Sequence, residues 1–419
     1  MKIRKIYAIA VAIVMLFSIA AFSACANNEP QTLSEKKQSF LQGIWQSIDN
    51  FEFNEKYEYY KELYKAQVAD DISKASSETD LYKIKNDARE TMSKVMYYQY
   101  IAGPVRDWSV ILINGKTEDG DYTITLHPSY TYPNRYRLKA DYTAKDSGIS
   151  IKAIMFEKTA GNETFTSKGE FVEDITRPDI IWDDSFGHEK YALCFVATKA
   201  GANIGCSVIE FTDYYSYSDL NVLSGQFADN QSATDEQIKT FVLQNLNGAE
   251  PDANIQLIPD TVTTTCFLNP ISNYYYNLSV TNTNMQKSSV CFNLPDELQA
   301  DSDDFEILYS SEVPLIFNGS ETKEISVKAG ENILLGGSSD ETGYITLIIK
   351  NKDVFFGYAV LKVVQNEACV SGFSRKINVV DIAKLHVRED EEYTEDAKKD
   401  ELLIRSFIHY SIEKYKNNL

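Results

Sequence analysis

The sequence contains few of the residues on which common active sites depend. Only four histidines occur among 419 residues, whereas nucleophilic catalysis needs a serine or cysteine beside an oriented base. The G-x-S-x-G motif of serine hydrolases and the H-E-x-x-H motif of zinc proteases are both absent. The six cysteines form no C-x-x-C pair, which argues against zinc-ribbon and thioredoxin-like sites. We therefore expect a chain that is not an enzyme and holds no cofactor.

Positive charge is also scarce. The chain has 41 Lys and Arg against 61 Asp and Glu, a formal net charge of −20. Nucleic-acid phosphates are neutralised by Lys and Arg, so this balance excludes a nucleic-acid partner. It favours neutral or basic partners, and it keeps a protein soluble near anionic surfaces.

The N-terminus has the layout of a secretory signal. A basic start, "MKIRK", precedes the uncharged run "IYAIAVAIVMLFSIAAF". The following residues, Phe22-Ser23-Ala24-Cys25, resemble a bacterial lipobox, in which small residues precede a lipidated cysteine. The resemblance implies cleavage after residue 24, acylation of Cys25, and anchoring in the cell membrane at its extracellular face. Two acyl chains are enough for stable anchoring. An ordinary cleaved signal and an uncleaved anchor are the alternatives, and both also export the chain.

An internal repeat predicts the architecture. The stretch "YALCFVATKAGANIGCSVIEF" (191–211) and the stretch "YITLIIKNKDVFFGYAVLKV" (344–363) share one hairpin pattern, at a repeat offset of 344 − 191 = 153. Segments from Phe165 and Phe317, and from Trp108 and Val262, align at nearly the same offset. Within each copy, apolar residues alternate with polar ones, as in a half-buried strand. We expect a mainly β protein with two tandem antiparallel β-sandwiches, Ig-like or jelly-roll-like, at 105–225 and 255–366.

Helical periodicity flanks these repeats. A capping box at Ser77 and Asp80 begins a helix whose apolar stripe contains Leu81 and Met92. The stretch "YKAQVADDISKASSETDLYKIKNDARETMSKV" resembles the FIVAR-like helical modules of Gram-positive surface proteins, which implies a spacer or a protein-binding bundle. The predicted division is a signal peptide (1–24), a tether (25–32), a helical bundle (33–103), repeat 1 (105–225), a linker (226–254), repeat 2 (255–366), a connector (367–393) and a C-terminal helix (394–419).

Tyrosines provide the best candidates for a binding surface. The chain has 27 of them, and tyrosine combines a flat apolar ring with a polar tip. Tyr214, Tyr215 and Tyr217 follow a predicted strand in polar surroundings, and Tyr275 lies opposite its apolar neighbours in "NYYYN". We interpret them as ligand-binding residues for an extracellular protein or a polysaccharide. Buried packing of these rings is the alternative.

The loop "WDDSFGHEK" (182–190) is the candidate metal site. Asp183, Asp184 and His188 combine carboxylate and imidazole ligands, which suit a transition metal better than calcium. A solvated turn is the alternative, because the matching loop of the second repeat lacks these residues. Elsewhere, Cys194 and Cys206 are equidistant from Ala200, so a hairpin centred there would place them opposite each other. Whether they pair, and whether the acidic turns bind calcium, stays open.

These observations favour a non-catalytic cell-surface lipoprotein that binds or scaffolds, with recognition of a protein as the first hypothesis. A carbohydrate-binding lipoprotein is the main alternative. A hydrolase with an unrecognised site is a more distant one, and a sandwich fold alone does not choose among them.

Overall fold

The computed structural model describes residues 32–105, 108–116, 120–128, 135–144, 148–159, 161–172, 180–183, 188–212, 221–227, 233–249, 255, 257–259, 261–268, 276–282, 288–294, 304–338, 340–366 and 374–417. The expected lipidation residue, Cys25, lies outside these residues. The chain divides into two compact units. Unit 1 comprises residues 1–105, 353–357 and 385–419, and unit 2 comprises 106–352 and 358–384.

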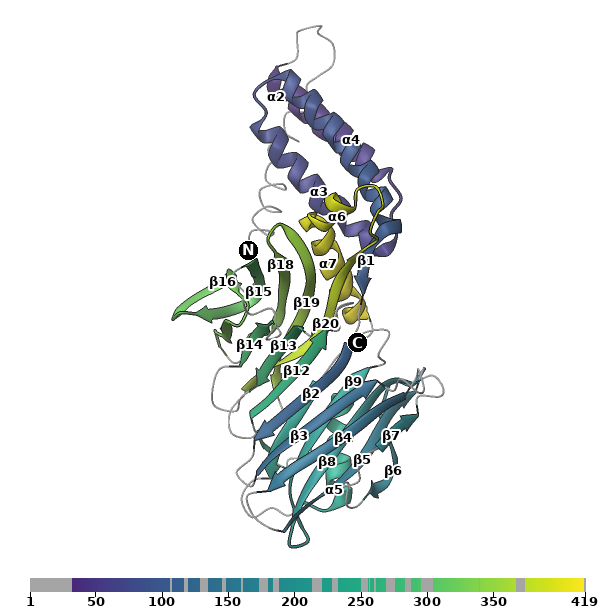
Figure 1. The fold of residues 1–419 in the computed structure, drawn as a ribbon, viewed down its shortest axis with the longest axis vertical. Coiled ribbons are helices and arrows are strands. Elements are labelled where there is room, and N and C mark those ends of the chain that lie inside the picture. The colour runs from purple at the N-terminus through teal and green to yellow at the C-terminus, as the bar shows by residue number, and fades with distance from the viewer. Residues whose placement is uncertain are drawn as a thin grey trace. The chain divides into compact units, whose positions relative to one another are not determined.

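Unit 1 is helical (Figure 1). Its helices are α2 (Leu33–Asp49), α3 (Glu55–Lys74), α4 (Glu78–Ile101), the short α6 (Thr394–Lys398) and α7 (Glu401–Asn417), and a short strand, β1 (Ala102–Val105), follows α4. The capping box expected at Ser77 and Asp80 is present at the start of α4, and Leu81 and Met92 are fully buried. The prediction of N-terminal helices and a C-terminal helix is confirmed. No helix in the described part of the chain is long and apolar enough to cross a membrane.

Buried tyrosines form much of the core of unit 1. Tyr57 donates hydrogen bonds to the carbonyl oxygens of Tyr98 (3.1 Å) and Ala102 (2.6 Å), which ties α3 to the end of α4. Helix α7 packs against α3, where Phe407 meets the Tyr57 ring edge-on at a centroid distance of 5.2 Å. Asp400 caps α7 by accepting from the amides of Leu402 and Leu403. The Tyr57 hydroxyl thus binds backbone carbonyls at the end of α4, and the Asp400 carboxylate binds backbone amides at the start of α7, which are the places where a helix leaves backbone groups without a partner of its own.

Unit 2 contains most of the strands, and the first half of this unit runs from β2 to α5. Its elements are β2 (Trp108–Lys116), β3 (Gly120–Pro128), β4 (Arg135–Ala144), β5 (Ile149–Thr159), β6 (Thr166–Val172), β7 (Ile180–Asp183), β8 (His188–Lys199), β9 (Ala202–Thr212), β10 (Asn221–Phe227) and α5 (Asp235–Leu246).

The second half repeats this order of strands. After the short β11 (Leu257–Pro259), it contains β12 (Thr261–Leu268), β13 (Tyr276–Asn282), β14 (Ser289–Asn293), β15 (Phe305–Phe317), β16 (Ser320–Lys328), β17 (Asn332–Leu335), β18 (Gly343–Asn351), β19 (Val354–Asn366) and β20 (Ser374–Val387). The predominance of antiparallel β-structure expected from the sequence is confirmed.

Strand pairings also correspond between the halves. In the first half, β2·β3, β3·β4, β4·β7, β5·β6, β5·β8, β8·β9 and β9·β10 are neighbours. In the second half, β12·β13, β13·β14, β14·β17, β15·β16, β15·β18, β18·β19 and β19·β20 are neighbours. The halves differ in two respects. Strand β17 also pairs with β15 in the second half. Strand β10 of the first half pairs with β11, which lies between the halves in the sequence, and β5, β6, β8, β9, β10 and β11 form a separate six-stranded sheet.

The two halves are joined by the antiparallel pair β2·β12, so strands expected in separate repeats belong to one sheet. Segments expected as connections also carry regular structure. Helix α5 lies in the expected linker and begins with a capping box between Thr234 and Gln237. Strand β20 lies in the expected connector, where residues 377–383 are all buried and therefore packed like a core strand.

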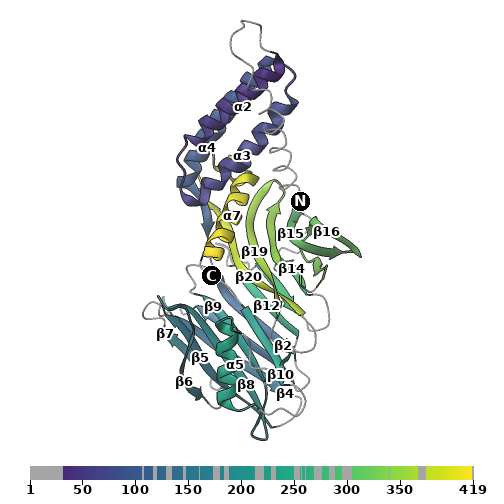
Figure 2. The same ribbon diagram turned by 180° about the vertical axis from the view of Figure 1, so that it is seen from behind.

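Helix α5 packs on the six-stranded sheet (Figure 2). Its Ile238, Phe241 and Val242 meet a row of buried residues on β5, β8 and β9. Along these strands the same-face residues alternate, as the two-residue period of a strand requires. The members from β5, β8 and β9 are Ile154, Phe156, Ala192, Cys194, Val196, Cys206 and Val208, and Phe227 of β10 joins them.

Candidate functional site

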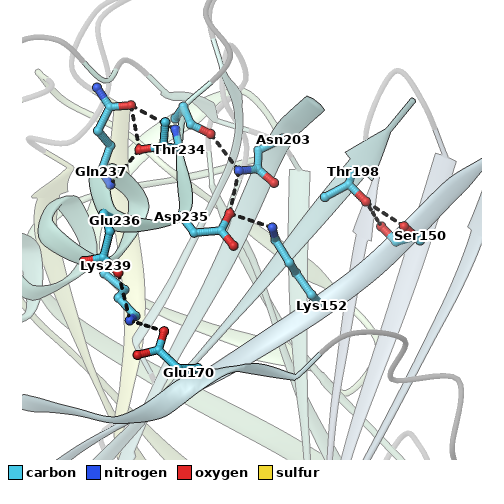
Figure 3. Close-up of polar contacts among 11 residues, drawn as sticks. Ser150, Lys152, Glu170, Thr198, Asn203, Thr234, Asp235, Glu236, Gln237 and Lys239 are labelled. Atoms are coloured by element: carbon cyan, nitrogen blue, oxygen red, sulfur yellow. Dashed lines mark hydrogen bonds and ion pairs between the residues drawn. The ribbon is translucent and has the colours of Figure 1, made fainter. Parts of the chain in front are cut away.

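A polar cluster lies between the N-terminus of α5 and the six-stranded sheet (Figure 3). Lys152 of β5 has a side chain only 8% exposed, and its Nζ lies 2.6 Å from Oδ1 of Asp235, the first residue of α5. Asn203 of β9 donates from Nδ2 to the same Asp235 oxygen at 2.9 Å and to the carbonyl oxygen of Ala233 at 2.6 Å. One carboxylate therefore binds two strands to the start of the helix.

Charge is balanced inside this cluster. Burial acts to raise the pKa of Asp235, but the hydrogen bonds from Lys152 and Asn203 and the nearby positive charge outweigh it, so its pKa is lowered. The carboxylate also lies in the first turn of α5, where the helix dipole favours a negative charge. The Lys152 ammonium lies 5.2 Å from the centroid of the Phe171 ring, within the range of a cation–π contact.

A second ion pair fixes α5 one turn further along. Lys239 Nζ lies 2.7 Å from Glu170 of β6 and 3.1 Å from Glu236. The Glu170 side chain is 83% exposed, so water screens this pair far more than the pair made by Lys152. At the same end of the sheet, the hydroxyls of Ser150 and Thr198 lie 2.6 Å apart across β5 and β8.

The chemistry of this cluster, which we call the helix clamp (Lys152, Asn203 and Asp235), is structural. Lys152 is held by a carboxylate that hydrogen bonds keep ionised, an arrangement that stores no proton and activates no nucleophile. One acceptor is left over, because Asn203 Oδ1 is buried and has no hydrogen-bond partner among the described residues. The helix clamp therefore stabilises the packing of α5 on the sheet.

The expected metal ligands fall on different strands. Asp183 is the last residue of β7, where it pairs with Arg135, and His188 is the first residue of β8, where it pairs with Thr159. These strands belong to different sheets, while Asp184 lies outside the described residues. Within the described ranges, no three His, Cys, Asp or Glu side chains form a group that would hold a metal ion.

The candidate tyrosines, Tyr214, Tyr215, Tyr217 and Tyr275, lie outside the described residues. The strands on either side of the first three are defined. Strand β9 ends at Thr212 and β10 begins at Asn221, and these strands pair with Glu210 opposite Asn221. The connection 213–220 therefore joins two neighbouring strands at the end of the six-stranded sheet opposite to the helix clamp.

The cysteine pair requires a correction. The hairpin turn is Ala200–Gly201, with both residues at positive φ, and the register shifts near Ala197. Cys194 consequently faces Val208, and Cys206 faces Val196, so the two cysteines are diagonal neighbours rather than opposite each other. Both are free thiols in the core beneath α5. Burial, with a contribution from the neighbouring Cys206, raises the pKa of Cys194.

Sequence reasoning missed the helix clamp. Lys152 and Asp235 are 83 residues apart, and nothing in the sequence indicates that they pair. Two signals were available, and the first is "TDEQ" (234–237), a capping box that precedes an apolar stripe. A lysine at the position of Lys152, between apolar strand residues, is the second.

No family model, curated protein or solved structure matches the chain.

Proposed function

We propose that the protein is a lipid-anchored protein of the extracellular membrane face that recognises a protein partner and does not catalyse a reaction. In this proposal, unit 2 is built from two tandem copies of one antiparallel β unit, and unit 1 is a spacer between the anchor and the β units. The binding surface is the loop end of the six-stranded sheet, which carries the tyrosine-rich connection 213–220.

The duplication is supported by strand registers as well as by strand order. In β2·β3, Ile111 faces Leu126, and in β12·β13, Thr264 faces Val280. The first members of these pairs differ in number by 264 − 111 = 153, which is the repeat offset of the sequence. The second members differ by 280 − 126 = 154. Pairings preserved at nearly one displacement are the expected result of copying one unit.

The observation that carries the binding proposal is the convergence of strand ends. Lys190 faces Thr212 and Thr159 faces His188, so the end of β5, the start of β8 and the end of β9 lie at one end of the six-stranded sheet. The connection 184–187 leads into β8 at this end, and the connection 213–220 follows β9 there. Two groups of candidate residues, chosen separately from the sequence, are therefore adjacent in the topology. Loops at one end of a rigid sheet are common binding surfaces.

The sheet edges favour loops over strand addition as the binding mode. Edge strand β6 is interrupted by a register shift, and its Gly169 has a φ of +79°. The other edge of the six-stranded sheet is β11, which has three residues. Short or bulged edges resist pairing with another chain. Because the chain is strongly acidic, the partner is expected to be neutral or basic at its contact surface.

The test is binding of residues 26–419 to intact producing cells, compared with the variant Tyr214→Ala/Tyr215→Ala/Tyr217→Ala. The proposal predicts saturable binding that protease treatment of the cells abolishes and that the triple variant loses. Affinity electrophoresis on wall and dietary polysaccharides tests the alternative. Retardation by a polymer, lost in the triple variant, would replace protein recognition by carbohydrate recognition. Equal binding of both proteins to cells would refute the site.

A further inference from the structure

The seam between the two halves of unit 2 is β2·β12, and its register is reciprocal. Leu112 faces Thr265, its own equivalent at the repeat offset (265 − 112 = 153). Ile111 faces Cys266, which is the equivalent of Ile113 (266 − 113 = 153). Ile113 in turn faces Thr264, which is the equivalent of Ile111 (264 − 111 = 153). Each residue from Val110 to Lys116 thus faces the equivalent of its own mirror position about Leu112, and the register shifts only beyond Phe267, where Trp108 faces Leu268.

This pattern defines a two-fold relation. When residue i of one copy faces j of the other and j faces i, the contact is isologous, as in a symmetric homodimer. The axis passes through the pair Leu112:Thr265, at the midpoint of β2 (Trp108–Lys116). The reciprocal register of β2·β12 does not follow from the pairings inside each half, because a β2·β12 pair shifted along its strands would leave those pairings unchanged.

We infer that the edge of β2 recognises itself, so that the partner with matching chemistry is the β2 edge of a second copy of this chain. The internal contact with β12 covers that edge in the intact molecule. Self-pairing about Leu112 would place Ile111 opposite Ile113, with β-branched side chains that suit strand pairs. Residues 108–114 carry no charge, so self-pairing brings no like charges together. The inference rests on the duplication described above and not on the binding proposal.

The experiment opens the seam in the full mature chain and traps the new contact. Thr264→Pro and Thr265→Pro are made separately, because neighbouring residues of a strand direct their N–H groups to opposite sides and one of the two weakens β2·β12. Ile181→Pro, in the edge strand β7 of the same sheet, is the matched control. Each variant also carries Leu112→Cys, with Cys266→Ser to remove the native thiol in the seam, and is oxidised with copper phenanthroline.

The inference predicts a disulfide-linked dimer for Leu112→Cys in one of the two seam variants, increasing with chain concentration. Ile113→Cys in the same background gives none, because two copies of residue 113 are diagonal neighbours rather than opposite each other. The β7 control stays monomeric. If neither proline variant folds, Leu112→Cys and Ile113→Cys are refolded from urea at increasing concentration without proline, and the same contrast is expected. Monomers throughout, or equal cross-linking at 112 and 113, would overturn the inference. The tyrosine variants leave this result unchanged.

Discussion

Removal of Asp235 should cost more than removal of any exposed carboxylate near α5. The Lys152 side chain is only 8% exposed, and Asp235→Ala leaves its ammonium without a carboxylate partner and deprives Asn203 of one acceptor. Losing one partner costs about 3–5 kcal/mol for a fully buried pair and about 0–1 kcal/mol for a surface pair. Because the Asp235 side chain is 41% exposed, we expect a value between these limits, about 2 kcal/mol.

The double variant gives the sharper result. Lys152→Met removes the buried charge while keeping an unbranched apolar stem, so Lys152→Met/Asp235→Ala should be more stable than Asp235→Ala alone. The positive coupling identifies the unpaired ammonium as the cause. Glu170→Ala is the matched control, because that carboxylate is exposed and Lys239 keeps Glu236 as a partner.

Hydrogen exchange of the amides in residues 235–246 is the assay, since it reports the opening of α5 without assuming that the two units unfold together. The expected order of exchange is Asp235→Ala fastest, the double variant intermediate, and Glu170→Ala close to wild type. If Asp235→Ala and Glu170→Ala exchange alike, or if the double variant is fastest, the helix clamp does not stabilise α5 in the way described.

Three further predictions follow from individual contacts. Because the pKa of Asp235 is lowered in the folded chain, its contribution to stability is present above its ordinary pKa and is lost as the pH falls through the lowered value. Acid should therefore reduce the protection factors of the α5 amides, which compare their exchange with the intrinsic rates at the same pH, more in wild type than in Asp235→Asn. Burial raises the pKa of Asp400, the cap of α7, despite hydrogen bonds from Tyr60 and the helix amides. Asp400→Asn should therefore preserve or increase the thermal stability of unit 1 at neutral pH, whereas Asp400→Ala should cost about 1 kcal/mol. Gly337 has a φ of +73°, which a residue with a side chain adopts only with strain, so Gly337→Ala should lower the free energy of unfolding of unit 2, measured by urea titration, by about 1 kcal/mol, while the Glu341 carboxylate next to the new Cβ can move aside.

Features that depend on contacts between residues close in the chain could be predicted from the sequence. The capping box at Ser77, the apolar stripe through Leu81 and Met92, and the two hairpins related by the repeat offset each involve contacts between residues close in the chain. The hairpin that contains Cys194 could be predicted in the same way, but its turn is Ala200–Gly201 and its register shifts by one residue near Ala197, and together these move the partner of Cys194 from Cys206 to Val208. A bulge of this kind carries no strong sequence signal.

Contacts between distant segments could not be predicted. The pair β2·β12 joins strands that are equivalent in the repeat. Alternation of apolar and polar residues predicts that a segment is a strand, but it does not predict which strand pairs with it. The clamp between Lys152 and Asp235 depends on the helix that follows β10 returning to the sheet that contains β5. Lys152 pairs with Val196, whose equivalent at the repeat offset is Ile349 (196 + 153 = 349), and Ile349 pairs with Ile307. The second half therefore has an apolar residue at the position of Lys152, so the polar clamp is not a requirement of the repeated strand order.

We propose that this chain recognises another protein through the connection between β9 and β10. The most direct measurement is photo-cross-linking on intact producing cells, with a benzophenone amino acid in place of Tyr215 in the full chain. A matched probe replaces Lys323 on β16, at an exposed strand of the second half. We expect one protein adduct from the Tyr215 probe, which is lost with Tyr214→Ala/Tyr217→Ala and is absent from the Lys323 probe. No adduct at Tyr215, or the same adducts from both probes, would contradict this proposal.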